Sequence, residues 1–285
     1  MNKKTIKVII AGVIIAVGGV IMVLCALGAT GWNFNHTNNW QEDTRTFDAP
    51  ISKIDLQVNC GQVILKRAET DKITITYQYD EIYQPSIGMN NGVLQIETPE
   101  RRWYDVVQIG VWDAPDMLIE IPQNCEPQLD LKLNAGTLQV DSGRFAKSIS
   151  VKINAGTLTL GDVVTETFEV KLNAGKFDAV KITCENAECK LNAGALDVAE
   201  IVCQTFDCKL NAGAANVSRL DSVSTSLRLS AGSVNVKMVG AQSDYNISVD
   251  KSAGSCNLSG HTNASATRTL TVNLSAGSAN VRFFD

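Results

Sequence analysis

The chain has 285 residues, of which 45% are hydrophobic and 19% are charged, and its formal net charge is −5. This length allows one or two domains. The acidic balance argues against nucleic acid as a partner, because proteins that bind nucleic acid present a basic surface.

The N-terminal residues predict a membrane anchor. Three lysines within the first seven residues precede a run without charge at 8–27. About 20 apolar residues can span a bilayer, and the lysines favour the cytoplasmic side. We therefore expect a cytoplasmic tail at 1–7, a single transmembrane helix at 8–29, and all later residues outside the cytoplasm. A cleaved signal peptide is the alternative, since residues 26–28 resemble a small-residue cleavage site.

The next segment predicts a linker and then the first turns of a repetitive structure. Residues 30–45 are polar and rich in Asn and Thr, so we expect a short stalk. Residues 55–65 align with 130–140 as a degenerate copy of the repeat described below, and residues 90–96 align with the same repeat. We therefore expect degenerate coils over 46–128.

Two irregular insertions, at 78–90 and 98–116, interrupt these early coils. The second combines arginine with aromatic side chains, a composition that is enriched at binding hot spots. Its candidate partner-binding residues are Arg101, Arg102, Trp103, Tyr104 and Trp112. The alternative is that these aromatics cap the open end of a solenoid, which needs to be covered.

From residue 134 onward the tripeptide Asn-Ala-Gly, and later Ser-Ala-Gly, recurs at a nearly constant spacing. Its eight glycines lie 20, 19, 19, 19, 19, 22 and 23 residues apart. A period of this size indicates a solenoid in which each repeat packs on its neighbours. Glycine supplies the positive φ that a sharp corner needs. We expect structural corners at Gly136, Gly156, Gly175, Gly194, Gly213, Gly232, Gly254 and Gly277.

The residues on both sides of each corner alternate between apolar and polar. In one coil, Val170 and Leu172 are apolar and Lys171 between them is polar. Such alternation predicts short strands with one buried face. A coil of about 19 residues is too short for a strand plus a crossover helix, so successive coils should stack as parallel strands about 4.8 Å apart. We predict an all-β fold, a parallel β-helix over 46–285 with regular coils over 129–285.

Stacking places equivalent positions in columns. One column is basic and comprises Lys132, Lys152, Lys171, Lys190, Lys209 and Arg228. A mostly acidic column two residues earlier comprises Asp130, Ser150, Glu169, Glu188, Asp207 and Ser226. The basic column could bind an anionic polymer, but we favour a mutually neutralised, solvated face because the acids are one side chain away. The corner asparagines form a third column, expected to be a hydrogen-bonded ladder.

The apolar N-terminal run, the degenerate coils, the strand at 117–122 and the Asn-Ala-Gly coils resemble the DUF4097 family. These are bacterial adhesin-type β-strand-repeat proteins, similar in style to the GIN adhesin-head domain. The resemblance covers residues 46–285 and rests on the repeat. It implies a β-helix in the cell envelope, and it transfers no catalytic residue.

Four of the eight cysteines, Cys184, Cys189, Cys203 and Cys208, have a spacing that resembles a zinc site. The repeat explains this spacing as well, because Cys184 precedes Cys203, and Cys189 precedes Cys208, by one period. In an inward position Cys behaves as a small hydrophobe. Disulfides between stacked coils are an open alternative, since stacked Cα atoms lie within bonding reach. We predict no metal site and no cofactor.

We expect a non-enzymatic function. A glycosidase needs two carboxylates about 5–10 Å apart, and Asp178 and Asp197 share an outward column. That column continues with asparagines, however, which indicates a ladder of small polar residues. The sequence therefore favours an adhesin-like interaction module or an envelope-sensing module in the cell membrane, with an envelope protein or glycan as partner. The alternative is a carbohydrate-active enzyme on a β-helix scaffold.

Overall fold

The computed structural model describes residues 40–284, apart from 49, 82, 101–114 and 146. The chain divides into two units, and the first, residues 1–40 with 100–114, lies almost entirely outside the described part. The second unit contains all of the described strands. The anchor expected at 8–29 lies outside the described residues, and within them no helix is long and apolar enough to cross a bilayer.

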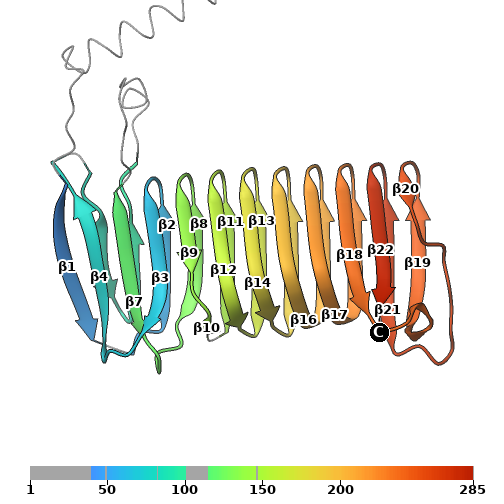
Figure 1. The fold of residues 1–285 in the computed structure, drawn as a ribbon, viewed down its shortest axis with the longest axis horizontal. Coiled ribbons are helices and arrows are strands. Elements are labelled where there is room, and N and C mark those ends of the chain that lie inside the picture. Colours follow the sequence, from blue (N-terminus) through green and yellow to red (C-terminus); the bar gives the residue numbers. More distant parts are fainter. Residues whose placement is uncertain (1–39, 49, 82, 101–114, 146, 285) are drawn as a thin grey trace, which may run out of the picture. The chain divides into compact units, whose positions relative to one another are not determined.

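The strands of the second unit form two ladders, and in the regular coils the chain passes from one ladder to the other at each corner (Figure 1). The first ladder contains the strands that precede the repeated corners, together with the hairpin strands β5 (Ser86–Asn90) and β6 (Val93–Glu97). Its spatial order is β5, β6, β2 (Lys53–Val58), β8 (Gln128–Leu133), β11 (Ser148–Ile153), β13 (Thr167–Leu172), β15 (Asn186–Leu191), the second halves of β16 (Ala195–Leu210) and β17 (Ala214–Leu229), β21 (Arg268–Leu274) and β19 (Tyr245–Lys251).

The second ladder contains the strands that follow the corners, together with β1 (Gln41–Asp48), β4 (Lys72–Tyr79) and β7 (Asp116–Pro122) at its N-terminal end. Its spatial order is β1, β4, β7, β3 (Gln62–Ala68), β9 (Thr137–Val140), β12 (Thr157–Val164), β14 (Lys176–Thr183), the first halves of β16 and β17, β18 (Ser233–Val239), β22 (Ser278–Phe284) and β20 (Ser255–Cys256). The short strand β10 (Gly143–Arg144) pairs with β12, and a 3-10 turn, η2 (Gln242–Asp244), precedes β19.

Pairing between regular coils is parallel and follows the repeat. Lys152 pairs with Lys171, and Lys171 pairs with Lys190. Among the described strands, antiparallel pairing joins β1 to β4, β4 to β7 and β5 to β6, all at the N-terminal end. The predicted all-β solenoid of stacked parallel coils is confirmed.

At both ends, however, the coils do not stack in sequence order. At the C-terminal end β21 lies between β17 and β19, and β22 lies between β18 and β20 (Figure 1). At the N-terminal end β2 lies between β6 and β8, and β3 lies between β7 and β9. The expected stacking of successive coils therefore holds in the middle of the solenoid and fails at its two ends.

One arginine at each end bonds to strands that this order brings together. Nη1 of Arg268, in β21, donates to Oδ1 of Asp221 at 2.8 Å and to the hydroxyl of Tyr245, in β19, at 3.1 Å. Nη1 of Arg67, in β3, donates to the carbonyl oxygen of Pro122, at the end of β7, at 3.1 Å. Burial lowers the pKa of Arg67 from its usual value. Both guanidinium groups thus satisfy polar atoms of strands that are distant in sequence.

Two N-terminal assignments made from the sequence are wrong. Gly92 lies in the hairpin between β5 and β6, and β6 pairs with β2 in the first ladder. Alignment of 90–96 with the repeat would place that strand after a corner, in the second ladder. In addition, β1 begins at Gln41 and pairs with β4 along its length, so residues 41–45 of the expected stalk belong to the sheet.

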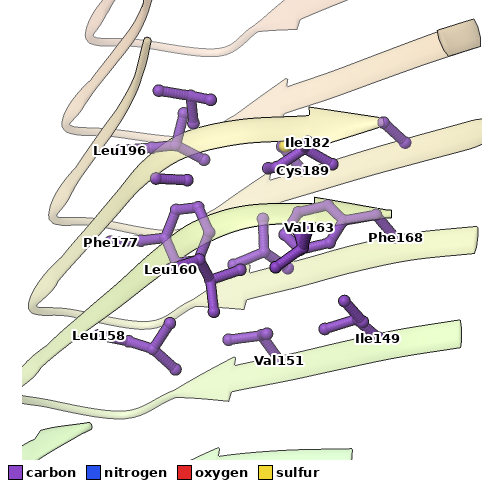
Figure 2. Close-up of a cluster of buried hydrophobic side chains, with 14 of the residues drawn as sticks. Ile149, Val151, Leu158, Leu160, Val163, Phe168, Phe177, Ile182, Cys189 and Leu196 are labelled. Carbon is purple, nitrogen blue, oxygen red and sulfur yellow. The ribbon is translucent and has the colours of Figure 1, made fainter. Parts of the chain in front are cut away.

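The core lies between the two ladders and is built from alternate residues of each strand. Ile149 and Val151 from β11 face Leu158 and Leu160 from β12 inside the coil, and all four are buried (Figure 2). Full burial of such a side chain contributes about 1.5–3 kcal/mol. The same alternation points the intervening residues outward, and they form the surfaces considered next.

Candidate functional site

The corners of the solenoid contribute one column of glycines and one column of asparagines. The eight corner glycines have φ values between 89° and 98°. Beside them, the corner asparagines are joined from Nδ2 to Oδ1 in a continuous series, at 2.5 Å from Asn134 to Asn59, 2.6 Å from Asn154 to Asn134, 2.7 Å from Asn173 to Asn154, and 2.8 Å both from Asn192 to Asn173 and from Asn211 to Asn192. The predicted amide ladder is confirmed, and it holds adjacent coils in a single register.

The basic column of the first ladder is largely paired with the acidic column beside it. Nζ of Lys190 lies 2.8 Å from Oε2 of Glu188 in its own coil and 3.4 Å from Oε1 of Glu169 in the preceding coil. Lys209 bridges Glu188 and Asp207 in the same way, at 3.0 and 3.5 Å. These contacts support the interpretation of a neutralised, solvated face over this part of the column.

The ion pairs of this face predict a loss of stability in acid. The hydrogen bond from Lys171 lowers the pKa of Glu169 below its usual value of 4.5, and the hydrogen bond from Lys190 does the same for Glu188. A folded-state pKa below the unfolded value adds stability that is fully present above the unfolded value and is lost as pH falls through the folded one. We expect the urea midpoint to fall below pH 4.5, and Glu169→Gln with Glu188→Gln to flatten that dependence. An unchanged slope in the double variant would show that other carboxylates cause it.

An outward column of the second ladder borders a groove of about 380 Å³. The lining spans four stacked coils through the register partners Asp197, Asn216, Asn235 and Asn280. Nδ2 of Asn235 donates to Oδ1 of Asn216 at 2.9 Å, and Nδ2 of Asn280 donates to Oδ1 of Asn235 at 3.4 Å. One wall of the groove is therefore a second amide ladder that ends in a carboxylate.

Two cations line the same groove. Lys237 in β18 and Arg282 in β22 are register partners, and both are exposed. Neither forms an ion pair with another residue in the part of the chain that the structure describes. This arrangement differs from the first ladder, where Lys190 and Lys209 each contact two carboxylates.

A β-bulge lies beside Lys237 in the stack. Two residues of β17, Ser218 and Arg219, oppose the single residue Lys237 of β18. Bulges turn side chains away from the regular direction of the strand. Arg219 extends to Glu200 in the preceding coil, with Nε 3.1 Å from Oε1. At the bulge β18 has one residue fewer than β17, so β18 offers no separate register partner for Arg219.

Two further grooves near the N-terminal end have a different charge. A groove of about 300 Å³ is lined by Asp55 and Glu97, and one of about 320 Å³ by Glu42 and Asp116. No lysine or arginine is among the described residues that line either of them. A negatively charged ligand therefore has an electrostatic reason to prefer the C-terminal groove.

The cysteines lie where the repeat predicts. Cys189 and Cys208 are register partners in the core, and no disulfide joins any of the seven described cysteines. Burial raises the pKa of Cys184, Cys203 and Cys208 to about 12 in each case, so these thiols stay protonated at neutral pH. Within the described residues, no group of three or more His, Cys, Asp or Glu side chains could hold a metal ion.

Sequence reasoning and structure point to different places for the site. The candidate partner-binding residues Arg101, Arg102, Trp103, Tyr104 and Trp112 lie outside the described residues. Lys237 and Arg282 were missed, because they are 45 residues apart and become neighbours only through the exchanged coil order. The sequence feature that could have identified them as equivalent positions is a pair of similar segments, Val-Lys-Met at 236–238 and Val-Arg-Phe at 281–283.

Comparison with known families agrees with the repeat. A family model described as Toastrack DUF4097 matches residues 51–284, which include both the degenerate and the regular coils. The chain belongs to the DUF4097 family. The resemblance inferred from the Asn-Ala-Gly coils is confirmed. Among curated proteins, no match to this DUF4097 chain was found.

Several solved structures are distantly similar to this DUF4097 protein. A "putative lipid binding protein" from Parabacteroides distasonis is 12% identical, with a TM-score of 0.48, over 87% of this chain and 98% of that one. A "putative adhesin" from the same organism is 9% identical, with a TM-score of 0.43, over 86% and 97% of the two chains. A "putative cell adhesion protein" from Clostridium sporogenes is 10% identical, with a TM-score of 0.31, over 86% and 100%. These values describe a distant likeness of fold.

Proposed function

We propose that this DUF4097 protein is a non-enzymatic interaction module of the cell envelope. In this proposal residues 8–29 anchor it in the membrane and the solenoid lies on the extracytoplasmic side. The uncharged run and the lysines before it support the anchor. The groove beside Asn216, Asn235 and Asn280 carries the proposal, because it combines hydrogen-bonding amides with two cations that have no described ion-pair partner.

A rigid scaffold favours binding at this groove over the rest of the regular surface. β18 is paired with β17 on one side and with β22 on the other, so most of the groove is formed before a ligand arrives and little conformational entropy is lost on binding. The first ladder already uses Lys190 and Lys209 for internal ion pairs. A ligand would have to displace those pairs, whereas it would meet Lys237 and Arg282 directly.

The charges argue against the alternative of a carbohydrate-active enzyme. Asp178 and Asp197 are register partners, but Oδ1 of Asp178 lies 2.8 Å from Nζ of Lys176. A general acid needs a raised pKa. In the described part of the chain, the carboxyl groups with shifted pKa values are Asp43, Glu169 and Glu188, and each pKa is lowered.

Binding without turnover is the expected result of the test. The full chain in detergent would be incubated with soluble glycan fragments from a bacterial cell envelope, and retention and new reducing ends would be measured together. We expect retention of fragments without an increase in reducing ends over hours. Release of reducing ends that stops in Asp178→Asn or Asp197→Asn would establish the enzyme instead. If the protein neither retains nor cleaves the fragments, the result contradicts an envelope glycan as the partner. An envelope protein would then be the remaining candidate.

The insertion at 98–116 supplies the second arm of this experiment. If its aromatic and arginine side chains bind the partner, replacement of Arg102, Trp103 and Tyr104 by Ala should abolish retention while β-sheet circular dichroism is kept. If they cap the solenoid, the same variant should lose its fold. Retention that survives in a folded triple variant would leave the groove as the binding surface.

A further inference from the structure

The groove on the second ladder carries a more specific inference about its ligand. Its amide wall is only partly used by the protein. An Asn side chain has two N–H donors and an oxygen with two lone pairs. Within the ladder, Asn235 donates one hydrogen bond to Asn216 and accepts one from Asn280. Each amide in the series therefore retains a donor and an acceptor that can be directed into the groove.

This combination matches hydroxyl groups. A hydroxyl donates one hydrogen bond and accepts others, so a chain rich in hydroxyls can engage the remaining donor and acceptor of one amide after another. The amides repeat along the stacking direction from Asn216 to Asn280, at the spacing of parallel strands, about 4.8 Å. The site thus favours an extended, polyhydroxylated chain that runs along the solenoid axis.

The charged residues select for an acidic version of such a chain. Lys237 and Arg282 lie next to each other in the stack and line the groove together with the amides. The guanidinium of Arg282 can form two parallel hydrogen bonds to a carboxylate or a phosphate, and Lys237 adds a second positive charge. At the other end of the amide ladder Asp197 repels anions. A ligand that carries both anionic groups and hydroxyls therefore fits this groove better than a neutral chain or one without hydroxyls.

We propose that this groove binds an acidic, polyhydroxylated chain of the kind found in envelope glycans, with its hydroxyls on the amides of Asn216, Asn235 and Asn280 and a carboxylate or phosphate on Lys237 and Arg282. This inference deepens the function proposed above and rests on it. An acidic peptide is the competing ligand. It would use the two cations, but it would have little use for a row of amides with free donors and acceptors.

The test measures binding of defined polymers to the full chain in detergent by calorimetry. The probes are polygalacturonate, poly(glycerol phosphate), neutral dextran and poly-L-glutamate. We expect polygalacturonate, poly(glycerol phosphate) or both to bind, with the stronger of the two identifying the anionic group. Dextran should bind at least about tenfold more weakly, because a charge-assisted hydrogen bond is lost. Poly-L-glutamate should also bind more weakly, because it lacks hydroxyls.

Two variants with equal charge change make the test specific. Lys237→Gln with Arg282→Gln should weaken binding by about a hundredfold, at about tenfold for each cation. The matched control, Lys190→Gln with Lys209→Gln, removes the same charge from the first ladder and should leave the affinity within about threefold. Asn235→Ala should weaken binding about tenfold. The equivalent change in the amide ladder of the corner asparagines, Asn192→Ala, should leave binding unchanged.

Specific outcomes would overturn the proposal. Equal losses in both charge variants would show a diffuse electrostatic effect, and equal binding of poly-L-glutamate would favour an acidic peptide. Failure of both acidic polymers to bind would exclude the ligand class. If envelope fragments are still retained by the variant that lacks Lys237 and Arg282, the proposed function stands and this site does not.

Discussion

Replacement of Gly194 by Ala is expected to lower the free energy of unfolding by about 3 kcal/mol or more, from backbone strain and from overpacking. Gly194 has φ +98°, and a Cβ atom at this position would lie 2.4 Å from the carbonyl oxygen of Gly175 in the neighbouring coil. That oxygen accepts the backbone hydrogen bond from Ala195 at 3.0 Å, so a shift of the oxygen would weaken a bond between neighbouring coils. Chemical denaturation followed by circular dichroism would measure the loss.

A second glycine provides the control for this prediction. Gly88 in β5 has no positive φ, and a Cβ atom there would meet nothing within 4 Å. We expect Gly88→Ala to be neutral or to stabilise the protein by about 0.4–1 kcal/mol, because Ala restricts the unfolded chain. Similar losses at Gly88 and Gly194 would mean that the corner is not the cause.

Removal of residues 268–285 is expected to unfold a coil that the truncated chain still contains. β19 pairs with β21, and β20 pairs with β22, so both strands lose their neighbours when the C-terminal coil is deleted. We expect amide exchange at 245–256 to accelerate by about a hundredfold or more, the mark of local opening with little cost, and proteases to cleave within 240–267. Hydrogen exchange with mass spectrometry would report both the opened coil and the intact remainder.

A longer truncation makes this experiment decisive. A chain that ends at residue 240 lacks both terminal coils but keeps β17 and β18 on their N-terminal neighbours. It should retain native protection up to about residue 220. If residues 245–256 kept full protection in the chain that ends at 267, that coil would have to stack directly on β17 and β18. Either the coil order described above would then be wrong, or residues 245–256 would not need β21 and β22 to stay folded.

Within the regular coils, the sequence by itself determined almost every neighbour. Lys171 and Lys190 are one period apart, and they pair because each coil completes one turn in that number of residues. The same relation predicts the ladder from Asn154 to Asn211, and the alternation around each corner identifies the buried positions. These properties follow from local periodicity, which a single sequence contains in full.

Only the tertiary structure decided the order of the end coils. A parallel strand needs a hydrogen-bonding edge and an apolar inner face, and every coil of a repeat offers both. The repeat therefore does not say which coil lies next to β17. Contacts between distant residues make that choice, among them the bonds from Arg268 to Asp221 and Tyr245.

The candidate site depends on that choice. Lys237 and Arg282 lie 45 residues apart, more than two periods, and a sequential stack would have separated them by another coil. The insertion of β22 next to β18 brings the two cations together and continues the amides of Asn216 and Asn235 with that of Asn280. Periodicity determined which side chains point outward. Long-range contacts determined which of them meet, because strand pairing alone does not distinguish one coil of the repeat from another.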